Sequence, residues 1–150
     1  MTITTDCQSL ITSDTRIKVS STLDKSVGKK CLIDDNLETC WTSQQGLPQY
    51  IQLTFLAPVI PKRIAMTFQG GFVGTKCSVF VSSAPDSPQW SVLSQLYPED
   101  VNRRQTFELP PESNTLLESG VHCLKLVFEQ SSDFFGRVTL YELKVEGRHL

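Results

Sequence analysis

The sequence lacks several features that would assign it to a particular class of protein. It has no apolar run near the roughly 20 residues of a membrane-spanning helix, and its first residues, MTITTDCQSLITSDTR, have neither the basic start nor the apolar core of a secretory signal. The formal net charge is only −2 and the pI is about 5.6, so no basic excess indicates a large footprint on nucleic acid or an anionic membrane. We therefore expect no membrane association, and direct binding of nucleic acid is disfavoured.

Metal-binding and catalytic residue types are also scarce. The chain has two histidines, five widely spaced cysteines and no C-x-x-C pair, which leaves little for a structural zinc site. Cysteines in odd number and at wide spacing predict reduced thiols, with Cys77 and Cys123 as small buried apolar groups, and hence a location in the nucleus or cytoplasm. No nucleophile, base and orienting group occur in a recognisable spacing, so we expect no enzymatic activity.

Alternating apolar and polar residues are the main positive signal. In YIQLTFL, Ile51, Leu53 and Phe55 would share one strand face while Gln52 and Thr54 share the other, which is typical of strands with one buried face. Turn-forming stretches such as QGGFVG and APDSP separate such runs. We expect strands near residues 16–21, 50–56, 63–69, 76–83, 90–96, 105–109, 121–129 and 138–146, and one or two helical turns within 111–119. This pattern predicts an all-β sandwich of about eight antiparallel strands over residues 15–150, preceded by a loosely ordered segment, 1–14.

The stretch LIDDNLETCWTS, residues 32–43, crowds acidic and amide side chains ahead of a tryptophan. An EF-hand loop is excluded, because the pair Asp34 and Asn36 is followed by Glu38 without the required glycine and position twelve is Gln45. Adjacent acids in one turn usually point apart, which disfavours a glycosidase carboxylate pair. The residues themselves predict a compact Asx-type turn.

Two sets of residues carry a resemblance to a known superfamily. The first consists of Ile33-Asp34, Asn36, Thr39, Trp41 and Ser43, and the second of Gly136-Arg137, Tyr141 to Val145 and Gly147. In this spacing they resemble the discoidin, or coagulation factor V/VIII type C, superfamily, which implies a galactose-binding-like jelly-roll sandwich. The stretches FQGGF, LYPED, QTF and SSDFFGRV also resemble a family of small intracellular repressors associated with an orphan nuclear receptor. That resemblance implies a monomeric nuclear cofactor, with the receptor as protein partner, that hinders the receptor's access to DNA.

The superfamily resemblance implies one structural calcium site and no other cofactor. Its ligands would be the side chains of Asp34, Thr39 and Glu142 and the carbonyl of Asn36, since calcium accepts six to eight oxygen ligands. The alternative is that Asp34 caps its own turn, while Glu142 pairs with Lys144, an arginine or solvent. Trp41 is expected in the core beneath this loop, although a sugar-stacking platform is the alternative.

The resemblance also places ligands of this fold where loops near residues 44–48, 70–75 and 131–137 converge. Arg137 could clamp a carboxylate or phosphate there, or form an ion pair with Asp133 or Glu142. The Gly70–Gly71 pair permits either a turn that exposes Phe72 or a bulge that folds it inward. The predicted partner site consists of Gln44, Phe72, Asp133, Phe134 and Arg137.

Three functions follow from these residues. The first is a non-catalytic protein-interaction module, and the second a carbohydrate or anionic small-ligand binder that uses Arg137, Gln44 and rim aromatics. The third is a nucleic-acid binder carried by the basic pairs Lys29-Lys30 and Arg103-Arg104, against which the negative net charge weighs.

Overall fold

Antiparallel strands account for nearly all the regular structure of the chain. The structure is a computed structural model and describes residues 7–150. The strands are β1 (Gln8–Ser9), β2 (Arg16–Val19), β3 (Trp41–Thr42), β4 (Gln49–Phe68), β5 (Lys76–Ser82), β6 (Ser91–Leu96), β7 (Arg104–Glu108), β8 (Val121–Gln130) and β9 (Thr139–His149). Two short 3-10 helices, η1 (Lys25–Val27) and η2 (Lys29–Leu32), lie between β2 and β3. The predicted all-β antiparallel fold is therefore confirmed.

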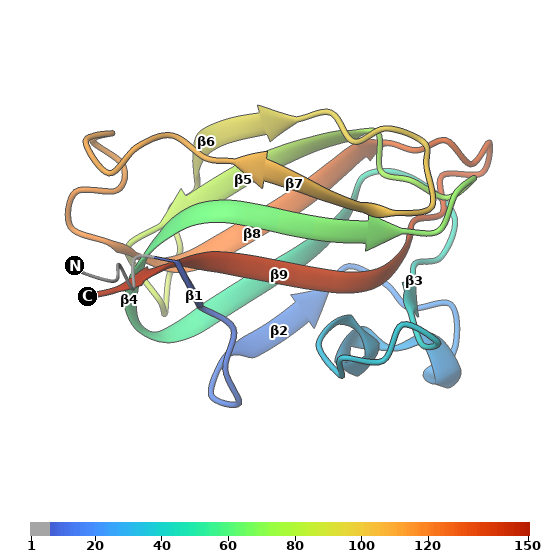
Figure 1. Cartoon of the computed structure of the whole chain (residues 1–150), viewed down its shortest axis with the longest axis horizontal. Coiled ribbons are helices and arrows are strands. Elements are labelled where there is room, and N and C mark those ends of the chain that lie inside the picture. Colours follow the sequence, from blue (N-terminus) through green and yellow to red (C-terminus); the bar gives the residue numbers. More distant parts are fainter. Residues whose placement is uncertain (1–6) are drawn as a thin grey trace, which may run out of the picture.

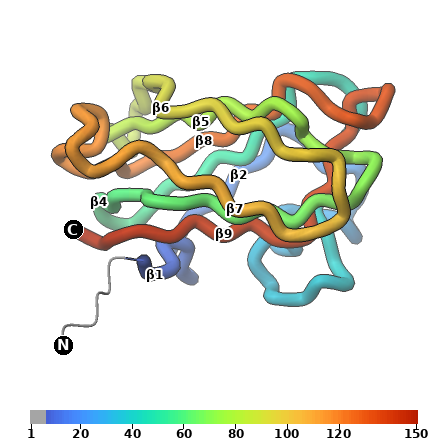
Figure 2. The backbone as a smooth tube through the Cα atoms, turned by 45° about the horizontal axis from the view of Figure 1, so that its top comes forward, coloured from blue at the N-terminus to red at the C-terminus, as the bar shows by residue number. Residues whose placement is uncertain are grey.

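Strand β4 belongs to both layers of the sandwich. Its first part pairs with β2 and, as far as Val59, with β8; its second part pairs with β9 from Val59 and with β7 from Arg63. One layer thus contains β2, the start of β4, β8, β5 and β6, and the other contains β7, the end of β4 and β9, with β1 and β3 on the far edge of β9 (Figure 1). Figure 2 shows the two layers from a second side, with the C-terminal β9 and the short β1 next to each other.

The core lies between the layers and follows the predicted alternation. Ile51 and Leu53 from the start of β4 are fully buried, as are Phe68 at its end and Phe128 of β8. The rings of Phe68 and Phe128 pack edge to face with centroids 5.8 Å apart, a favoured aromatic geometry. Trp41 is also fully buried, and its indole N–H donates to the Ser21 carbonyl at 3.0 Å, which confirms its predicted place in the core.

Some predicted elements differ from the observed ones. The strands expected at 50–56 and 63–69 are one strand, because β4 exchanges its partner β8 for β9 across an irregularity between Thr54 and Val59. The prolines at 58 and 61 interrupt the alternation in this part of the sequence and make one strand look like two. Residues 111–119 form successive turns instead of a helix, whereas η1 and η2 were not predicted.

The N-terminal segment is partly described. The prediction of a loose segment over 1–14 includes residues 1–6, which lie outside the described residues. Further along, β1 pairs with β9, Leu10 donates its N–H to the Val145 carbonyl at 2.8 Å, and the Leu10 side chain is 1% exposed. This part is therefore attached to the sandwich by burial and pairing instead of being loose. No helix within residues 7–150 is long and apolar enough to cross a membrane.

Candidate interaction site at the loop end

Loops from distant parts of the chain meet at one end of the sandwich, which we call the loop end (right-hand side of Figure 1). It consists of residues 43–48, 69–75, 97–103 and 131–138, which connect β3 to β4, β4 to β5, β6 to β7 and β8 to β9. Backbone hydrogen bonds join the first and last loops from Gly46 N–H to Phe135 O at 2.8 Å, and the second and last from Ser132 N–H to Val73 O at 2.9 Å. The convergence predicted from the sequence is present.

Arg137 is held by Asp133 in its own loop. The Asp133 carboxylate accepts the backbone N–H and the Nε–H of Arg137, both at 3.0 Å, and a longer bond from Nη2 at 3.4 Å. The Asp133 side chain is only 11% exposed and the Arg137 side chain 31%. Hydrogen bonds from Arg137 lower the pKa of Asp133, and the carboxylate in turn raises the pKa of Arg137. Arg137 therefore braces the loop, which is the ion-pair alternative predicted from the sequence.

The aromatic side chains of the loop end differ widely in exposure. Phe72 is half-buried, and the Arg137 guanidinium carbon lies 5.1 Å from its ring centroid and 5.9 Å from that of Phe135. Phe134 and Phe135 meet edge to face with centroids 5.2 Å apart, and they are 93% and 53% exposed. Phe72 thus packs under the arginine, whereas Phe134 is the side chain that projects into solvent.

The first and last loops touch at two glycines. Gly136 has φ +82°, and a Cβ built on it would come within 3.1 Å of the backbone N and C of Gly46. A side chain is therefore disfavoured at Gly136 both by the left-handed backbone and by the neighbouring chain. The contact holds the turn that carries Phe134 and Phe135 against residues 43–48.

Residues outside the predicted site also fasten these loops. Asp100 Oδ1 accepts the Gly71 N–H at 2.8 Å and the Ser132 hydroxyl at 3.2 Å. Gln49 is 5% exposed, and its amide donates to the Gly46 carbonyl at 2.6 Å. Asp100 belongs to the LYPED stretch. Gln49 was not predicted: its amide bonds the preceding loop at Gly46, while its side-chain carbonyl accepts from Ser20 and Ser21, which lie far along the chain.

Gln44 stands apart from the other predicted site residues. Its side-chain amide donates to the Thr22 carbonyl at 3.2 Å and its backbone N–H to the Ser21 hydroxyl at 3.0 Å. Arg137 contacts both Phe72 and Asp133, and Phe134 follows Asp133 in the same loop, but Gln44 has no hydrogen bond or ion pair to this group within residues 7–150.

The predicted calcium loop closes on itself. Asp34 accepts the Thr39 hydroxyl at 2.5 Å and the Asn36 N–H at 3.0 Å, and the Thr39 hydroxyl also lies 2.9 Å from the Asn36 carbonyl. The bonds from Thr39 and Asn36 lower the pKa of Asp34. These oxygens are hard ligands of the kind calcium accepts, and they are gathered within one turn.

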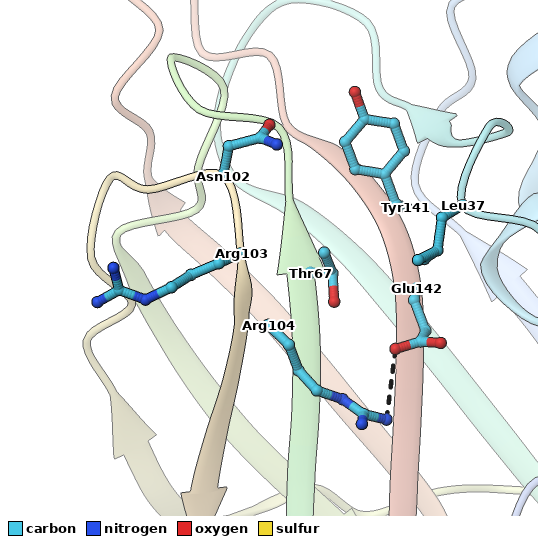
Figure 3. A pocket seen from close by; sticks show the side chains of 7 residues that line it. All are labelled: Leu37, Thr67, Asn102, Arg103, Arg104, Tyr141 and Glu142. Atoms are coloured by element: carbon cyan, nitrogen blue, oxygen red, sulfur yellow. Dashed lines mark ion pairs between the residues drawn. The ribbon is translucent and has the colours of Figure 1, made fainter.

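Glu142 pairs with an arginine of the sheet. Its carboxylate lies 3.4 Å from Nη2 of Arg104, beside an open depression of about 510 Å³ lined by Leu37, Thr67, Asn102, Arg103, Arg104, Tyr141 and Glu142 (Figure 3). Within residues 7–150 no group of three or more His, Cys, Asp or Glu side chains could hold a metal. The oxygens of Asp34, Asn36 and Thr39 are close together, as the predicted calcium site requires. Glu142 instead pairs with Arg104, as the alternative interpretation of the sequence expected. Calcium binding stays a prediction.

Solved structures with the same fold include carbohydrate-binding modules. Chitosan-binding module 1 of a Paenibacillus chitosanase/glucanase has a TM-score of 0.73 and 15% identity, with 89% of this chain and 96% of that chain covered. The family 32 module of Clostridium perfringens NanJ, in complex with galactose, has a TM-score of 0.70 and 17% identity over 94% of this chain and 98% of that chain. The C-terminal domain of a Bacteroides fragilis chitobiase has a TM-score of 0.74 and 21% identity over 97% and 99%. At these identities the similarity shows the fold, a discoidin-like β-sandwich.

Sequence relatives are much more similar. The nuclear receptor 2C2-associated protein of Danio rerio is 40% identical over 143 residues, covering 93% of this chain and 96% of the relative. The Homo sapiens protein of the same name is 37% identical over 142 residues, with the same coverage of both chains. No protein-family model matches the chain. The identity over nearly the whole length shows that this chain belongs to the family of nuclear receptor 2C2-associated proteins.

Proposed function

We propose that the chain is a non-catalytic module of the nucleus or cytoplasm that binds an orphan nuclear receptor through its loop end and hinders the receptor's binding to DNA. The observation that carries the proposal is Phe134, a large apolar side chain that is 93% exposed on a turn held by the Asp133–Arg137 pair and the Gly46–Phe135 hydrogen bond. The names of the relatives, nuclear receptor 2C2-associated protein, support the choice of partner.

An exposed phenylalanine on a braced turn has the properties of an interface anchor. Aromatic side chains enter partner pockets and account for a large share of binding energy. Because the turn is already held in one conformation, binding would cost little ordering entropy. Phe135 packs against Phe134 at 5.2 Å and supports it from the side.

The proposed mechanism is occlusion. The acids at the loop end are tied to backbone N–H groups or to arginine, as Asp100 is to Gly71 and Asp133 to Arg137, and the chain as a whole carries a net charge of −2. A surface with little positive charge has low affinity for DNA phosphates but can cover the basic surface with which a receptor holds DNA. The module would therefore compete with DNA for the receptor without binding DNA itself.

A binding measurement with two alanine variants tests this proposal. The receptor is nuclear receptor 2C2, titrated into the full chain by calorimetry, and Phe134→Ala is expected to weaken binding about 30-fold, the effect of a typical interface hot spot of about 2 kcal/mol. Leu56→Ala is the matched control, because Leu56 is also apolar and 76% exposed but lies in the middle of β4, away from the loop end. Equal affinity of the Phe134→Ala variant and the wild type would contradict the proposal.

The second candidate is a carbohydrate or anionic small-ligand binder. It is favoured by the depression next to the loop end, whose lining includes Asn102, Arg103 and Arg104. Arg103 and Arg104 are more exposed than Arg137, at 69% and 51% against 31% of the side chain, although each of the three also has an acidic partner, and Gln44 is held by Thr22. Amide chemical-shift changes at Asn102–Arg104 on addition of galactose or inorganic phosphate would support this candidate, and an unchanged spectrum would remove it.

A further inference from the structure

Strand β6 is an edge of the sandwich with no electrostatic protection. It pairs with β5 and with no other strand in residues 7–150. Unpaired strand edges invite pairing with another chain, and proteins guard them with charged side chains, prolines, β-bulges or short strands. The edge strands β2 and β7 carry such charges, namely Arg16 and Lys18, and Arg104 and Glu108. The sequence of β6, Ser-Val-Leu-Ser-Gln-Leu, contains none.

An irregularity in the middle of β6 changes which residues face outward. Val79 of β5 lies opposite Ser94, whereas the next residue, Phe80, lies opposite Val92, so β6 has one extra residue there. Before this bulge the outward side chain is Val92, which is 52% exposed. After it, Leu96 points into the core, and Tyr97 donates its hydroxyl to the outward Gln95 at 2.9 Å.

Trp90, which precedes β6, continues this outer row. Its ring centroid lies 5.4 Å from Nζ of Lys125, and Lys125 is an outward residue of β8 because its neighbours Leu124 and Leu126 are fully buried. The outer face of β6 therefore carries Val92 and Gln95, with Trp90 and Tyr97 just before and after the strand, at positions symmetric about the bond between Leu93 and Ser94. The Trp90 ring leans over β5 toward Lys125 of β8.

We propose that β6 pairs antiparallel with β6 of a second copy of this chain, around a twofold axis through the Leu93–Ser94 bond. In this register Val92 of one copy lies opposite Gln95 of the other, and Trp90 opposite Tyr97. Each outward position of β6 then lies opposite an outward position of the other copy, as cross-strand pairing in a sheet requires. A shift by one residue would set outward side chains against inward ones.

The pairing satisfies the free backbone groups of both copies and closes after two chains, as expected of a twofold interface. Two uncharged strands also approach without like-charge repulsion, which the basic β2 could not do. Because the strands run in opposite directions, the two loop ends point away from each other, and Tyr97, the first residue of the loop 97–103, is the loop-end residue that takes part in the pairing. The dimer is thus independent of the receptor interaction proposed above, and it replaces the monomer expected from the sequence.

The mass of the full chain in solution tests the dimer. Sedimentation equilibrium between about 1 µM and about 100 µM, the affinity range expected of a small interface, should show twice the chain mass of 16.8 kDa at the upper end. Leu56→Lys, a charge placed on an exposed position of β4 that β8 and β5 separate from β6, should leave that mass unchanged. A single-chain mass at every concentration would overturn the proposal.

Two double variants test the register. Val92→Lys with Gln95→Lys sets like charges opposite each other twice across the axis and should give the single-chain mass. Val92→Lys with Gln95→Glu sets opposite charges there and should keep the dimer. Both positions are exposed, so the melting temperatures should stay near that of the wild type. The same mass for both double variants, whether one chain or two, would overturn the proposed pairing.

Discussion

The contact between Gly136 and Gly46 allows a sharp test of how the loop end is held together. Gly136→Ala introduces a Cβ at φ +82° that would lie 3.1 Å from the Gly46 backbone. Gly71→Ala introduces the same group at φ +90°, where nothing lies within 4 Å. Both variants add one methyl group to a residue with positive φ. They differ in that only the methyl group at residue 136 lies close to the backbone of another loop.

The expected magnitudes follow from these contacts. A left-handed conformation costs an alanine about 1–2 kcal/mol, which is the expected loss for Gly71→Ala. In Gly136→Ala the neighbouring loop must also give by a few tenths of an ångström, which strains the hydrogen bond from Gly46 N–H to Phe135 O at 2.8 Å and costs up to about 1 kcal/mol. The total of up to about 3 kcal/mol corresponds to a melting temperature up to about 12 °C below the wild type in a domain of this size.

The assay is urea-induced unfolding of both variants, compared by their midpoints at equal slope. Gly136→Ala should be the less stable of the two, and it should also bind the receptor more weakly because the turn carrying Phe134 has moved. If Gly136→Ala were as stable as Gly71→Ala, the two loops would not be in the contact described, and the braced-turn argument would fail.

Three further measurements test other parts of the structure. Hydrogen bonds from Arg148 and Lys62, at 2.6 and 2.8 Å, lower the pKa of Glu112 to about 2. A carboxylate whose pKa is lowered in the folded state stabilises the fold above its unfolded pKa near 4.5, and this stabilisation is lost as the pH falls toward 2. Glu112→Gln should therefore be less stable than the wild type at pH 7 and equally stable near pH 2; a difference in unfolding free energy that stays constant with pH would refute this. Calcium should raise the melting temperature of the wild type and not that of Asp34→Asn, and no calorimetric shift in either would remove the calcium prediction. Burial raises the pKa of both Cys77 and Cys123, so iodoacetamide should alkylate the exposed Cys7 of the native protein and leave these two unmodified, whereas their modification without unfolding, seen by mass spectrometry, would contradict their burial.

Most of the fold could be predicted from the sequence, because a strand with one buried face alternates apolar and polar residues. The alternation of Ile51, Leu53 and Phe55 with polar residues predicts a strand, and all three side chains are buried. The pattern fails where a strand bends: β4 continues past Pro58, because new partners on β9 replace those on β8. Strand continuity of this kind depends on residues far along the chain and has no local signal.

The convergence of the loops could be predicted from the superfamily resemblance, but individual side-chain contacts of the candidate site were predictable only where they are local. Asp133 and Arg137 are four residues apart and form the predicted pair. Glu142 was considered together with the calcium loop, but the register of β4 with β7 and β9 brings Arg104 beside it instead. The outward-facing residues of β6 could not be predicted for the same reason. The extra residue at Leu93–Ser94 is defined by the pairing of β6 with β5, which has no local sequence signal.

A competition gel shift tests the central claim most directly. Nuclear receptor 2C2 is bound to its DNA element, and the wild-type chain or the Phe134→Ala variant is added in increasing excess. The account predicts that the wild type releases the DNA and forms no band with DNA alone, while Phe134→Ala requires about 30-fold higher concentration for the same release. Undiminished receptor–DNA complex in the presence of excess wild-type chain, or equal release by both chains, would contradict it.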